Sequence, residues 1–154
     1  MTSTAYEFQV TVDAADPHTQ ADWWAQTLGW QVEPANEEFI RRMVSAGQAT
    51  EDDTKLHNGV LVWKTGAAIT HPEGTGRAPR VLFMLVPEPK QVKNRVHLDV
   101  RAGLDALPDV VAAMTARGAT FLHDGHQGPF TWVTLADPEG NEFCVSSSAS
   151  PGTT

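Results

Sequence analysis

The fold is decided by residues 8–32, which read FQVTVDAADPHTQADWWAQTLGWQV. Apolar and polar residues alternate over Phe8–Asp13, which is the period-two pattern of a half-buried strand. Asp16, followed by proline, suits a helix N-cap and first turn, and the next apolar residues keep helical spacing. Gly29 suits the left-handed residue that ends a helix. The stretch predicts a strand, an amphipathic helix and a short strand at Trp30–Glu33.

The same succession occurs a second time in residues 96–122, which read VHLDVRAGLDALPDVVAAMTARGATFL. The alternation at the start predicts a strand, Leu107–Met114 has a helical apolar face, Gly118 ends it, and Ala119–Leu122 predicts the next strand. His97 follows Gln9 by 88 residues, and Gly118 follows Gly29 by 89. An offset that stays this constant indicates an internal duplication.

Each copy is expected to continue with two further strands. In the second copy these are Thr131–Leu135 and Glu142–Val145, on either side of the turn Asp137–Asn141. In the first copy the matching strands are predicted at Gly59–Lys64 and Val81–Val86. The first copy is also expected to carry an insertion, with a short helix at Glu37–Ser45 capped by Asn36 and loops at 46–58 and 67–80, and a further loop is expected at 122–130 in the second copy.

The alternation within the strands assigns side chains to two faces. One face is predicted to pack on the helices and form the core, with Phe8, Val10, Val12, Val96, Leu98, Val100, Val133, Leu135, Phe143 and Val145. The other face receives Gln9, Thr11, His97, Asp99, Trp132, Thr134, Glu142 and Cys144. Imidazole, thiol and indole groups are unusual on a plainly solvated face, so this face predicts a ligand pocket. A wet surface is the alternative.

Composition excludes several classes of function. The chain has 154 residues, with 11 Lys and Arg against 19 Asp and Glu, for a net charge of −8. This balance argues against binding to nucleic acid or to anionic lipid. No apolar run approaches the roughly 20 residues of a membrane span. One cysteine and no leader-like segment at Met1–Phe8 give a cytoplasmic setting as the expectation.

The sequence resembles the vicinal oxygen chelate superfamily, and within it the glyoxalase-like and bleomycin-resistance-like proteins. The resemblance rests on Thr27–Trp30, on Val86–Lys90 leading into Lys93–Asp99, and on Leu135–Phe143 with its Asp-Pro-Glu-Gly-Asn turn. It implies an α+β fold in which two paired βαβββ modules form one curved, cleft-lined, eight-stranded sheet. A single domain is expected over residues 1–146, with modules at about 6–87 and 94–146, and a disordered tail at 147–154.

The resemblance also implies a divalent metal held by one side chain from the first and last strand of each module. Gln9, His97 and Cys144 stand at three of these positions, and the fourth falls at about Met84. Cys144 replaces the glutamate that many relatives carry. This set is poor for magnesium and suits zinc, iron, manganese or nickel. A protein without any metal is the alternative, and an inert buried thiol is the alternative for Cys144.

The expected catalytic residues are His97, because histidine is a common general base, and Asp99, which could orient it. Substrate binding is expected from the other residues of the pocket face, which are Gln9, Thr11, Met84, Trp132, Thr134, Glu142 and Cys144. His123 and His126 are assigned to a flexible loop near the pocket. For Asp99 a structural ion pair with Arg95 is the alternative.

Two functions follow from the resemblance. The first is a lyase, isomerase or dioxygenase acting on a small organic molecule in the cleft. Glyoxalase I activity itself is not expected, because two of its usual metal carboxylates are absent. The second is a metal-free protein that sequesters a drug or natural product, as bleomycin-binding relatives do. A homodimer is implied, and module pairing within one chain or across the dimer stays open.

Overall fold

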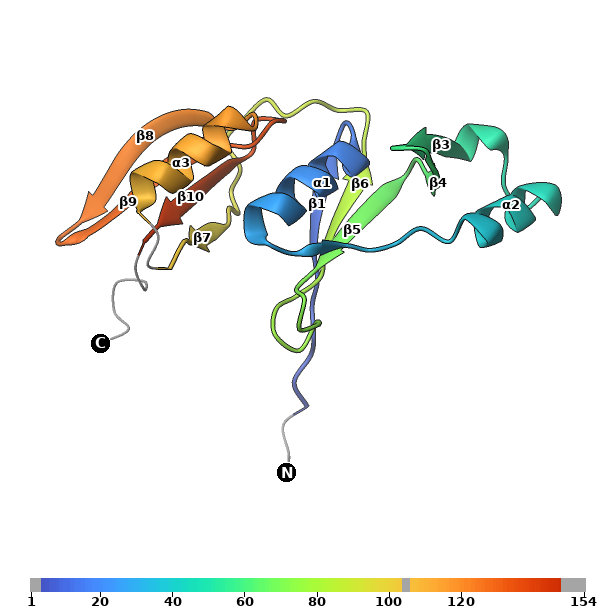
Figure 1. Ribbon diagram of the computed structural model, residues 1–154, viewed down its shortest axis with the longest axis horizontal. Helices are drawn as coiled ribbons and strands as arrows, with labels where there is room; N and C mark the ends of the chain where they lie inside the picture. The colour runs from blue at the N-terminus through green and yellow to red at the C-terminus, as the bar shows by residue number, and fades with distance from the viewer. Residues whose placement is uncertain (1–3, 104–105, 148–154) are drawn as a thin grey trace. The chain divides into compact units, whose positions relative to one another are not determined.

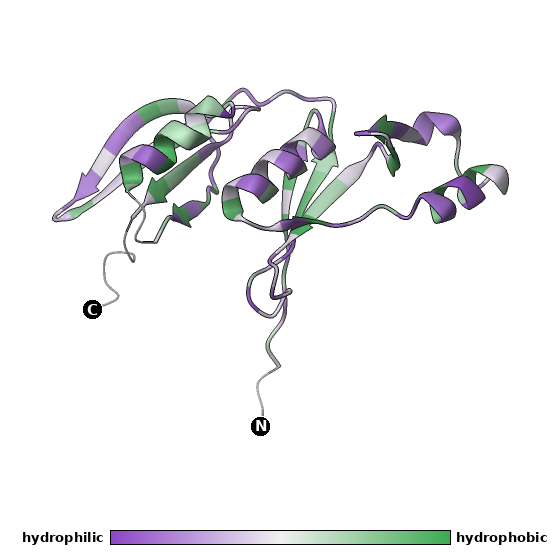
Figure 2. Cartoon of the chain, viewed as in Figure 1, coloured by the Kyte–Doolittle hydropathy of each residue, from purple (hydrophilic) through white to green (hydrophobic). Residues whose placement is uncertain are grey.

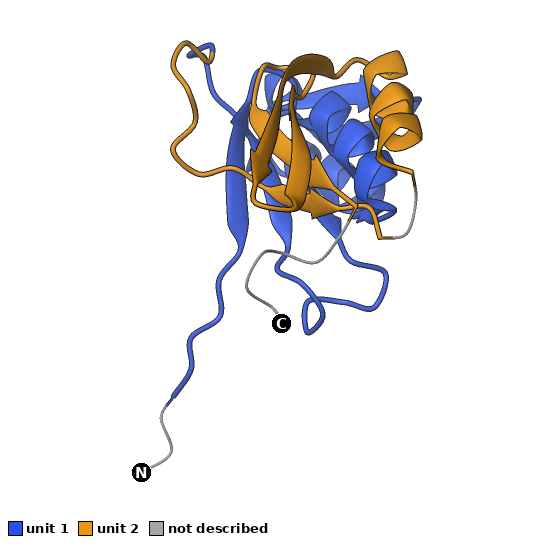
Figure 3. Cartoon of the chain, turned by 90° about the vertical axis from the view of Figure 1, so that its left-hand side faces the viewer, with its two compact units in different colours: residues 1–89 blue, residues 90–154 orange. Residues whose placement is uncertain are grey.

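The structure is a computed structural model, and it describes residues 4–103 and 106–147. The chain divides into two compact units, residues 1–89 and residues 90–154, coloured separately in Figure 3. Of the tail expected at 147–154, residues 148–154 lie outside the described part. Within the described ranges, no helix has the length and apolar character needed to cross a membrane.

Unit 1 is a βαβββ sheet that carries an insertion (Figure 1). Its strands pair in the order β1-β6-β5-β2, with β1 parallel to β6, and α1 packs against β5 and β6. The insertion lies between β2 and β5. The elements are β1 (Val10–Ala14), α1 (Pro17–Leu28), β2 (Gln31–Val32), α2 (Glu37–Ser45), the 3-10 helix η1 (Glu51–Asp53), β3 (Thr54–His57), β4 (Val60–Trp63), β5 (Gly66–Thr70) and β6 (Val81–Leu85).

Unit 2 repeats this topology without the insertion. The pairing order is β7-β10-β9-β8, with β7 parallel to β10, and α3 packs against β10. The elements are β7 (Asp99–Arg101), α3 (Leu107–Ala116), β8 (Thr120–Gln127), β9 (Phe130–Ala136) and β10 (Glu142–Ser146). In both units the first strand lies beside the last one, so the predicted α+β fold of two βαβββ modules is confirmed.

The helix ends follow the sequence signals. The Asp16 carboxylate accepts a hydrogen bond from the Thr19 amide at 3.2 Å and caps α1, and Gly29 ends that helix at a φ of 68°. The Asn36 side chain caps α2 in the same way. These caps satisfy amide groups that a helix leaves without partners in its first turn, and both predicted helices therefore begin where expected.

The core of unit 2 agrees with the predicted face. Val133, Leu135, Phe143 and Val145 are buried. In Figure 2, β10 and β6 are coloured toward the hydrophobic end of the scale. Of the other six predicted core residues, Val10, Val12, Leu98 and Val100 are half-buried and two are exposed, so the prediction was wrong for those two.

Those two residues are Phe8 and Val96, which are 72% and 81% exposed. Both precede the strands β1 and β7, which begin only at Val10 and Asp99. A side chain outside the paired part of a strand is not placed on its buried face. The alternation in the sequence thus continues beyond the hydrogen-bonded ladder.

The prediction for the first copy was also wrong about its third strand. β4 pairs with β3 in a separate two-stranded hairpin, and β3 lies in a segment predicted as a loop. The strand that pairs antiparallel with β6 is instead β5, most of which lies in the loop predicted at 67–80. Its sequence, Gly-Ala-Ala-Ile-Thr, lacks a clear alternation. The small residues serve close packing, because a Cβ at Gly66 would lie 3.2 Å from the Phe83 carbonyl oxygen.

The predicted loop at 122–130 was likewise mostly strand. β8 continues to Gln127 and pairs with β9, with a register irregularity between Phe121 and His123. Its residues from His123 onward are largely polar and exposed. This strand forms one edge of the sheet of unit 2, where polar residues on both faces are tolerated.

The turn before β10 is held by one buried carboxylate. Asp137 is 3% exposed, and its Oδ1 accepts hydrogen bonds from the amides of Glu139 (2.9 Å) and Asn141 (3.0 Å). The Asp137 amide donates to the Asn141 carbonyl at 2.8 Å. The predicted turn is confirmed, and it fixes the point at which β10 enters the sheet.

Candidate functional site

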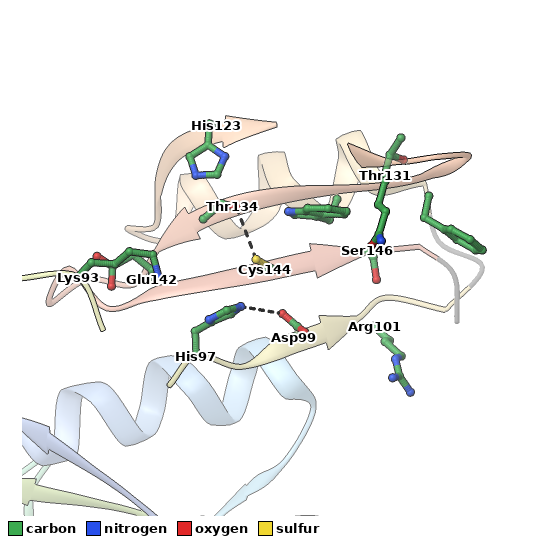
Figure 4. A pocket seen from close by; sticks show the side chains of 13 residues that line it. Lys93, His97, Asp99, Arg101, His123, Thr131, Thr134, Glu142, Cys144 and Ser146 are labelled. Atoms are coloured by element: carbon green, nitrogen blue, oxygen red, sulfur yellow. Dashed lines mark hydrogen bonds and ion pairs between the residues drawn. The ribbon is translucent and has the colours of Figure 1, made fainter. Parts of the chain in front are cut away.

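A cleft of about 400 Å³ lies on the face of the unit 2 sheet that carries the predicted pocket residues (Figure 4). All four strands of that sheet contribute side chains to its walls. The lining residues are Lys93, His97, Asp99, Arg101, His123, Gln127, Phe130, Thr131, Trp132, Thr134, Glu142, Cys144 and Ser146. The volume suits a small organic molecule.

Strand register arranges the lining side chains in two rows. Asp99 is opposite Cys144, Cys144 is opposite Thr134, and Thr134 is opposite His123. We call these four residues the polar row. Because side chains on one face recur at every second residue, the row crosses the sheet from β7 to β8 on a single face. A carboxylate, a thiol, a hydroxyl and an imidazole are therefore neighbours in space.

The second row lies two residues further along each strand. From the same registers, Arg101 is on β7, Ser146 on β10, Trp132 on β9 and Gly125 on β8. We call these four residues the tryptophan row. Its only aromatic side chain is the half-buried Trp132, and Phe130 extends the same wall. The cleft thus has a polar half and an aromatic half.

His97 lies just before β7, and the sheet holds its position. The Cys144 amide donates a hydrogen bond to the carbonyl of Leu98 at 3.0 Å, which fixes the backbone beside His97. The His97 Nε2 atom lies 3.3 Å from Oδ1 of Asp99. The ligand atoms of His97, Asp99 and Cys144 all lie within 4.8 Å of one another. We call these three residues the His-Asp-Cys cluster.

The thiol of Cys144 is kept protonated by its surroundings. Burial raises the pKa of Cys144, and the nearby Asp99 carboxylate raises it further. The Thr134 hydroxyl, 3.5 Å from the sulfur, acts in the opposite direction but does not outweigh them. A protonated thiol is a weak nucleophile, so the structure gives Cys144 no activation of that kind.

Glu142 lines the cleft but its carboxylate is already engaged. Lys90 Nζ donates to Oε1 at 2.9 Å, and the Asn94 amide donates to Oε2 at 3.1 Å. Burial raises the pKa of Glu142, but these hydrogen bonds outweigh it and lower the pKa to about 2. Glu142 therefore ties residues 90–94 to the start of β10 in its charged form.

Six of the predicted site residues come together in unit 2, and the other three belong to unit 1. His97, Asp99, Trp132, Thr134, Glu142 and Cys144 line the cleft of unit 2. Gln9, Thr11 and Met84 belong to unit 1, where each is exposed. The Gln9 side-chain oxygen accepts a hydrogen bond from Arg80 at 3.1 Å. Participation of these three residues stays a prediction.

The duplication allows the two units to be compared position by position. Thr11, 88 residues before Asp99, is opposite Leu82, and Leu82 is opposite Ala68. This row corresponds to Asp99, Cys144 and Thr134 in unit 2. The register thus makes Leu82, two residues before Met84, the counterpart of Cys144. One copy carries chemical groups where the other is largely apolar.

Sequence reasoning missed seven side chains of the cleft, which are Lys93, Arg101, His123, Gln127, Phe130, Thr131 and Ser146. His123 was assigned to a flexible loop, but it stands on β8 in the polar row, and Figure 4 shows it across the cleft from His97. Its partner in the loop assignment, His126, does not line the cleft. The alternation of His123, Gly125 and Gln127 was the signal for this strand. Lys93, at one end of the cleft, carried no pattern that would single it out.

The His-Asp-Cys cluster fits a borderline divalent metal better than a hard one. It offers one nitrogen, one oxygen and one sulfur donor, the donor types that zinc accepts, and three protein ligands leave a fourth position open. Ligand atoms around tetrahedral zinc are separated by roughly 3.5 Å, so small side-chain movements would close the cluster around an ion. Coordination would also remove the thiol proton.

A family model described as the glyoxalase-like domain matches residues 9–146. The chain belongs to the glyoxalase-like domain family. Its fold is that of the vicinal oxygen chelate superfamily, as the resemblance implied. The comparison with curated proteins found no significant relative.

Solved structures of this superfamily show the same fold at low sequence identity. The fosfomycin resistance protein FosX from Listeria monocytogenes, solved with Mn(II) and a dihydroxypropylphosphonic acid, is 7% identical, with a TM-score of 0.62 over 96% of this chain and 93% of its own. The oxidase ChaP-H2 is 13% identical, with a TM-score of 0.58 over 96% of each chain. A glyoxalase/bleomycin resistance protein/dioxygenase family enzyme from Burkholderia phytofirmans is 16% identical, with a TM-score of 0.56 over 92% and 97%.

Proposed function

We propose that this protein is an enzyme of the isomerase or lyase type that moves a proton on a small organic substrate bound in the cleft of unit 2. The observation that carries the proposal is the His97–Asp99 pair in the cleft wall, with Nε2 and Oδ1 3.3 Å apart. An imidazole oriented by a carboxylate is the usual arrangement of a general base.

In this proposal each member of the polar half has one task. His97 takes the proton from a carbon atom next to a substrate carbonyl, and Asp99 stabilises the imidazolium that forms. The Thr134 hydroxyl and the protonated Cys144 thiol share one hydrogen bond, so the one of them that accepts in it keeps its own proton to donate to the oxygen on which negative charge develops. The apolar wall around Trp132 binds the remainder of the molecule.

A divalent metal is compatible with the same residues. If His97, Asp99 and Cys144 hold an ion such as zinc, it supplies Lewis-acid polarisation of a substrate oxygen at the cleft. FosX, which has the same fold, was solved with Mn(II), and this supports a metal at the His-Asp-Cys cluster. A His97 nitrogen engaged by a metal is not available as the base, so metal content and proton transfer must be measured together.

The test is proton exchange in D2O. We expect the wild-type protein to catalyse loss of the carbon-bound proton from at least one compound of a panel such as pyruvate, phenylpyruvate and 2-hydroxyacetophenone, followed by NMR. His97→Gln should abolish the exchange, and Asp99→Asn should slow it about 10- to 100-fold. Metal content is measured on the same samples.

A matched control is His126→Gln, because His126 is an exposed histidine on β8 that does not line the cleft. Its exchange rate should equal that of the wild type. Full exchange activity in the His97→Gln variant would refute the proposal.

A second candidate is the metal-free binding protein. Cys144 favours it, because a protonated thiol occupies the position at which many relatives carry a metal-binding glutamate. A protein that binds a ligand tightly but catalyses no exchange or turnover of it, with or without added metal, would support this candidate over the enzyme.

A further inference from the structure

Gly125 and Trp132 face each other across the strands β8 and β9. A Cβ atom built on Gly125 would lie 2.7 Å from Cζ2 of the Trp132 indole and still closer to Cε2 and Nε1. Real Cβ contacts essentially never fall below 3.0 Å. The indole therefore lies directly on the backbone of Gly125, in space that any other residue would fill.

Space, rather than backbone conformation, explains the glycine at this position. Gly125 is not among the glycines with positive φ, in contrast to Gly128 in the adjacent turn. An alanine at position 125 would keep its backbone but would push the indole away. Glycines opposite aromatic residues in sheets are known to be covered in this way. Gly125 thus sets the position of the Trp132 ring.

The position of the ring matters because Trp132 lines the cleft. Because it lies against Gly125, the indole adds an apolar surface to the aromatic half of the site. The polar row begins two residues further along the strands, a distance of about 7 Å. A single six-membered ring stacked on the indole would therefore place its substituent among Asp99, Cys144 and Thr134.

We propose that Gly125 is the residue that gives this cleft its specificity, and that the ligand is a flat aromatic ring bearing an oxygen-containing polar substituent. The inference rests on the proposed function for the location of the site and deepens it by naming the substrate class. The ring stacks on the Trp132 indole, and the substituent reaches the His-Asp-Cys cluster. Gly125 acts as a positioning residue, because it acts through Trp132.

The experiment compares two probes that carry the same two substituents, one on a flat aromatic ring and one on a saturated ring. 2-Hydroxybenzoate is flat, and 2-hydroxycyclohexane-1-carboxylate carries the same groups on a puckered saturated ring. Dissociation constants are measured by ligand-detected NMR titration. Aromatic stacking contributes about 0.5–1.5 kcal/mol, so the wild type should prefer the flat probe roughly 2- to 10-fold.

Three variants locate the origin of that preference. Trp132→Leu removes the ring and should bring the two dissociation constants together. Gly125→Ala should do the same, and the double variant should lose no more than either single one, because both act through one ring. The matched control is Gly76→Ala, since Gly76 has ordinary φ and open space where a Cβ would be. It should keep the wild-type ratio.

A second readout does not require that Gly125→Ala folds. The indole N–H resonance of Trp132, assigned by its disappearance in Trp132→Leu, should shift when 2-hydroxybenzoate is added to wild-type protein, and should shift less with the saturated probe. The inference is overturned if the wild type binds both probes equally or binds neither. It is also overturned if a folded Gly125→Ala variant keeps the preference.

The outcome is separable from that of the proposed function. The His97→Gln variant removes the proposed base but should keep the preference for the flat probe, because the stacking surface is intact. Retained proton exchange in that variant would refute the catalytic proposal while the ring preference stands. A lost ring preference with intact exchange would refute only the inference about Gly125.

Discussion

The chemical role open to Cys144 is set by its neighbours in the sheet. As the single cysteine of the chain, it has no second cysteine with which to form an intramolecular disulfide. In the structure it lies between Asp99 and Thr134 in the polar row, with its pKa raised by burial and by the carboxylate. It is therefore a hydrogen-bonding thiol that becomes a thiolate only at high pH or on a metal.

This environment predicts slow alkylation of Cys144. The rate of reaction with iodoacetamide should rise with pH along a curve whose midpoint is higher in the folded protein than in urea-denatured protein, because only the thiolate reacts. Asp99→Asn should move the folded midpoint toward the denatured one. A folded midpoint at or below the denatured value would contradict the assignment. Since the chain has one cysteine, the reaction follows this residue alone.

At the scale of elements, local sequence signals predicted the helix caps and the turn, and the apolar alternation predicted the buried face of β9 and β10. The caps at Asp16 and Asn36 and the turn at Asp137 depend on neighbouring residues, so they could be predicted. β5 could not, because its small residues are selected by the close approach of β6, a contact distant in sequence.

The candidate site shows the same division. His97, Asp99 and Cys144 could be predicted to share a face, since the period of a strand is two. His123 lies beside them because β8 pairs with β9. That pairing could not be predicted, because the polar composition of β8 resembles that of a loop. The engagement of Glu142 by Lys90 and Asn94 likewise depends on how residues 90–94 run beside β10.

The lowered pKa of Glu142 predicts that the free energy of unfolding depends on pH. The folded pKa of about 2 lies below the ordinary value of 4.5, so the unfolded chain binds a proton first as the pH falls. The stabilisation is fully present above about pH 4.5 and is lost as the pH falls toward 2. Glu142→Gln should lower the free energy of unfolding at neutral pH by about 1 kcal/mol, after allowance for solvent screening at a partly exposed pair.

The measurement is urea unfolding of the wild type and Glu142→Gln between pH 7 and pH 3. The difference between the two proteins should shrink at the acidic end. Glu88→Gln, at an exposed glutamate, is the control and should differ little from wild type. A difference that does not change with pH would show that the loss is one of packing rather than of charge.

At the scale of the whole molecule, the two units share a topology but not a chemistry. The row Thr11, Leu82 and Ala68 occupies in unit 1 the register positions of Asp99, Cys144 and Thr134 in unit 2. At these register positions the carboxylate and the thiol occur in unit 2 only. Whether Gln9, Thr11 and Met84 serve the same site stays a prediction of the family resemblance.

The effect of zinc on the stability of the whole protein tests whether the metal-binding groups lie in unit 2. Free zinc at about 100 times its dissociation constant would stabilise the folded state by about 2.7 kcal/mol and raise the Tm by roughly 5–10 °C. His97→Ala, Asp99→Asn and Cys144→Ser should each remove most of the rise, and a chelator should reverse it. Gln9→Ala should remove less. An equal rise in wild type and His97→Ala would place any bound zinc outside the His-Asp-Cys cluster.

The composition of β8 has a consequence for how the protein behaves in solution. This strand is the edge of its four-stranded sheet, and from His123 to Gln127 it carries histidine, aspartate, glycine and glutamine. An open edge lined with apolar residues would invite another chain to add a strand, which is how many proteins aggregate. The polar sequence that made β8 resemble a loop thus also disfavours self-association through the edge of the sheet.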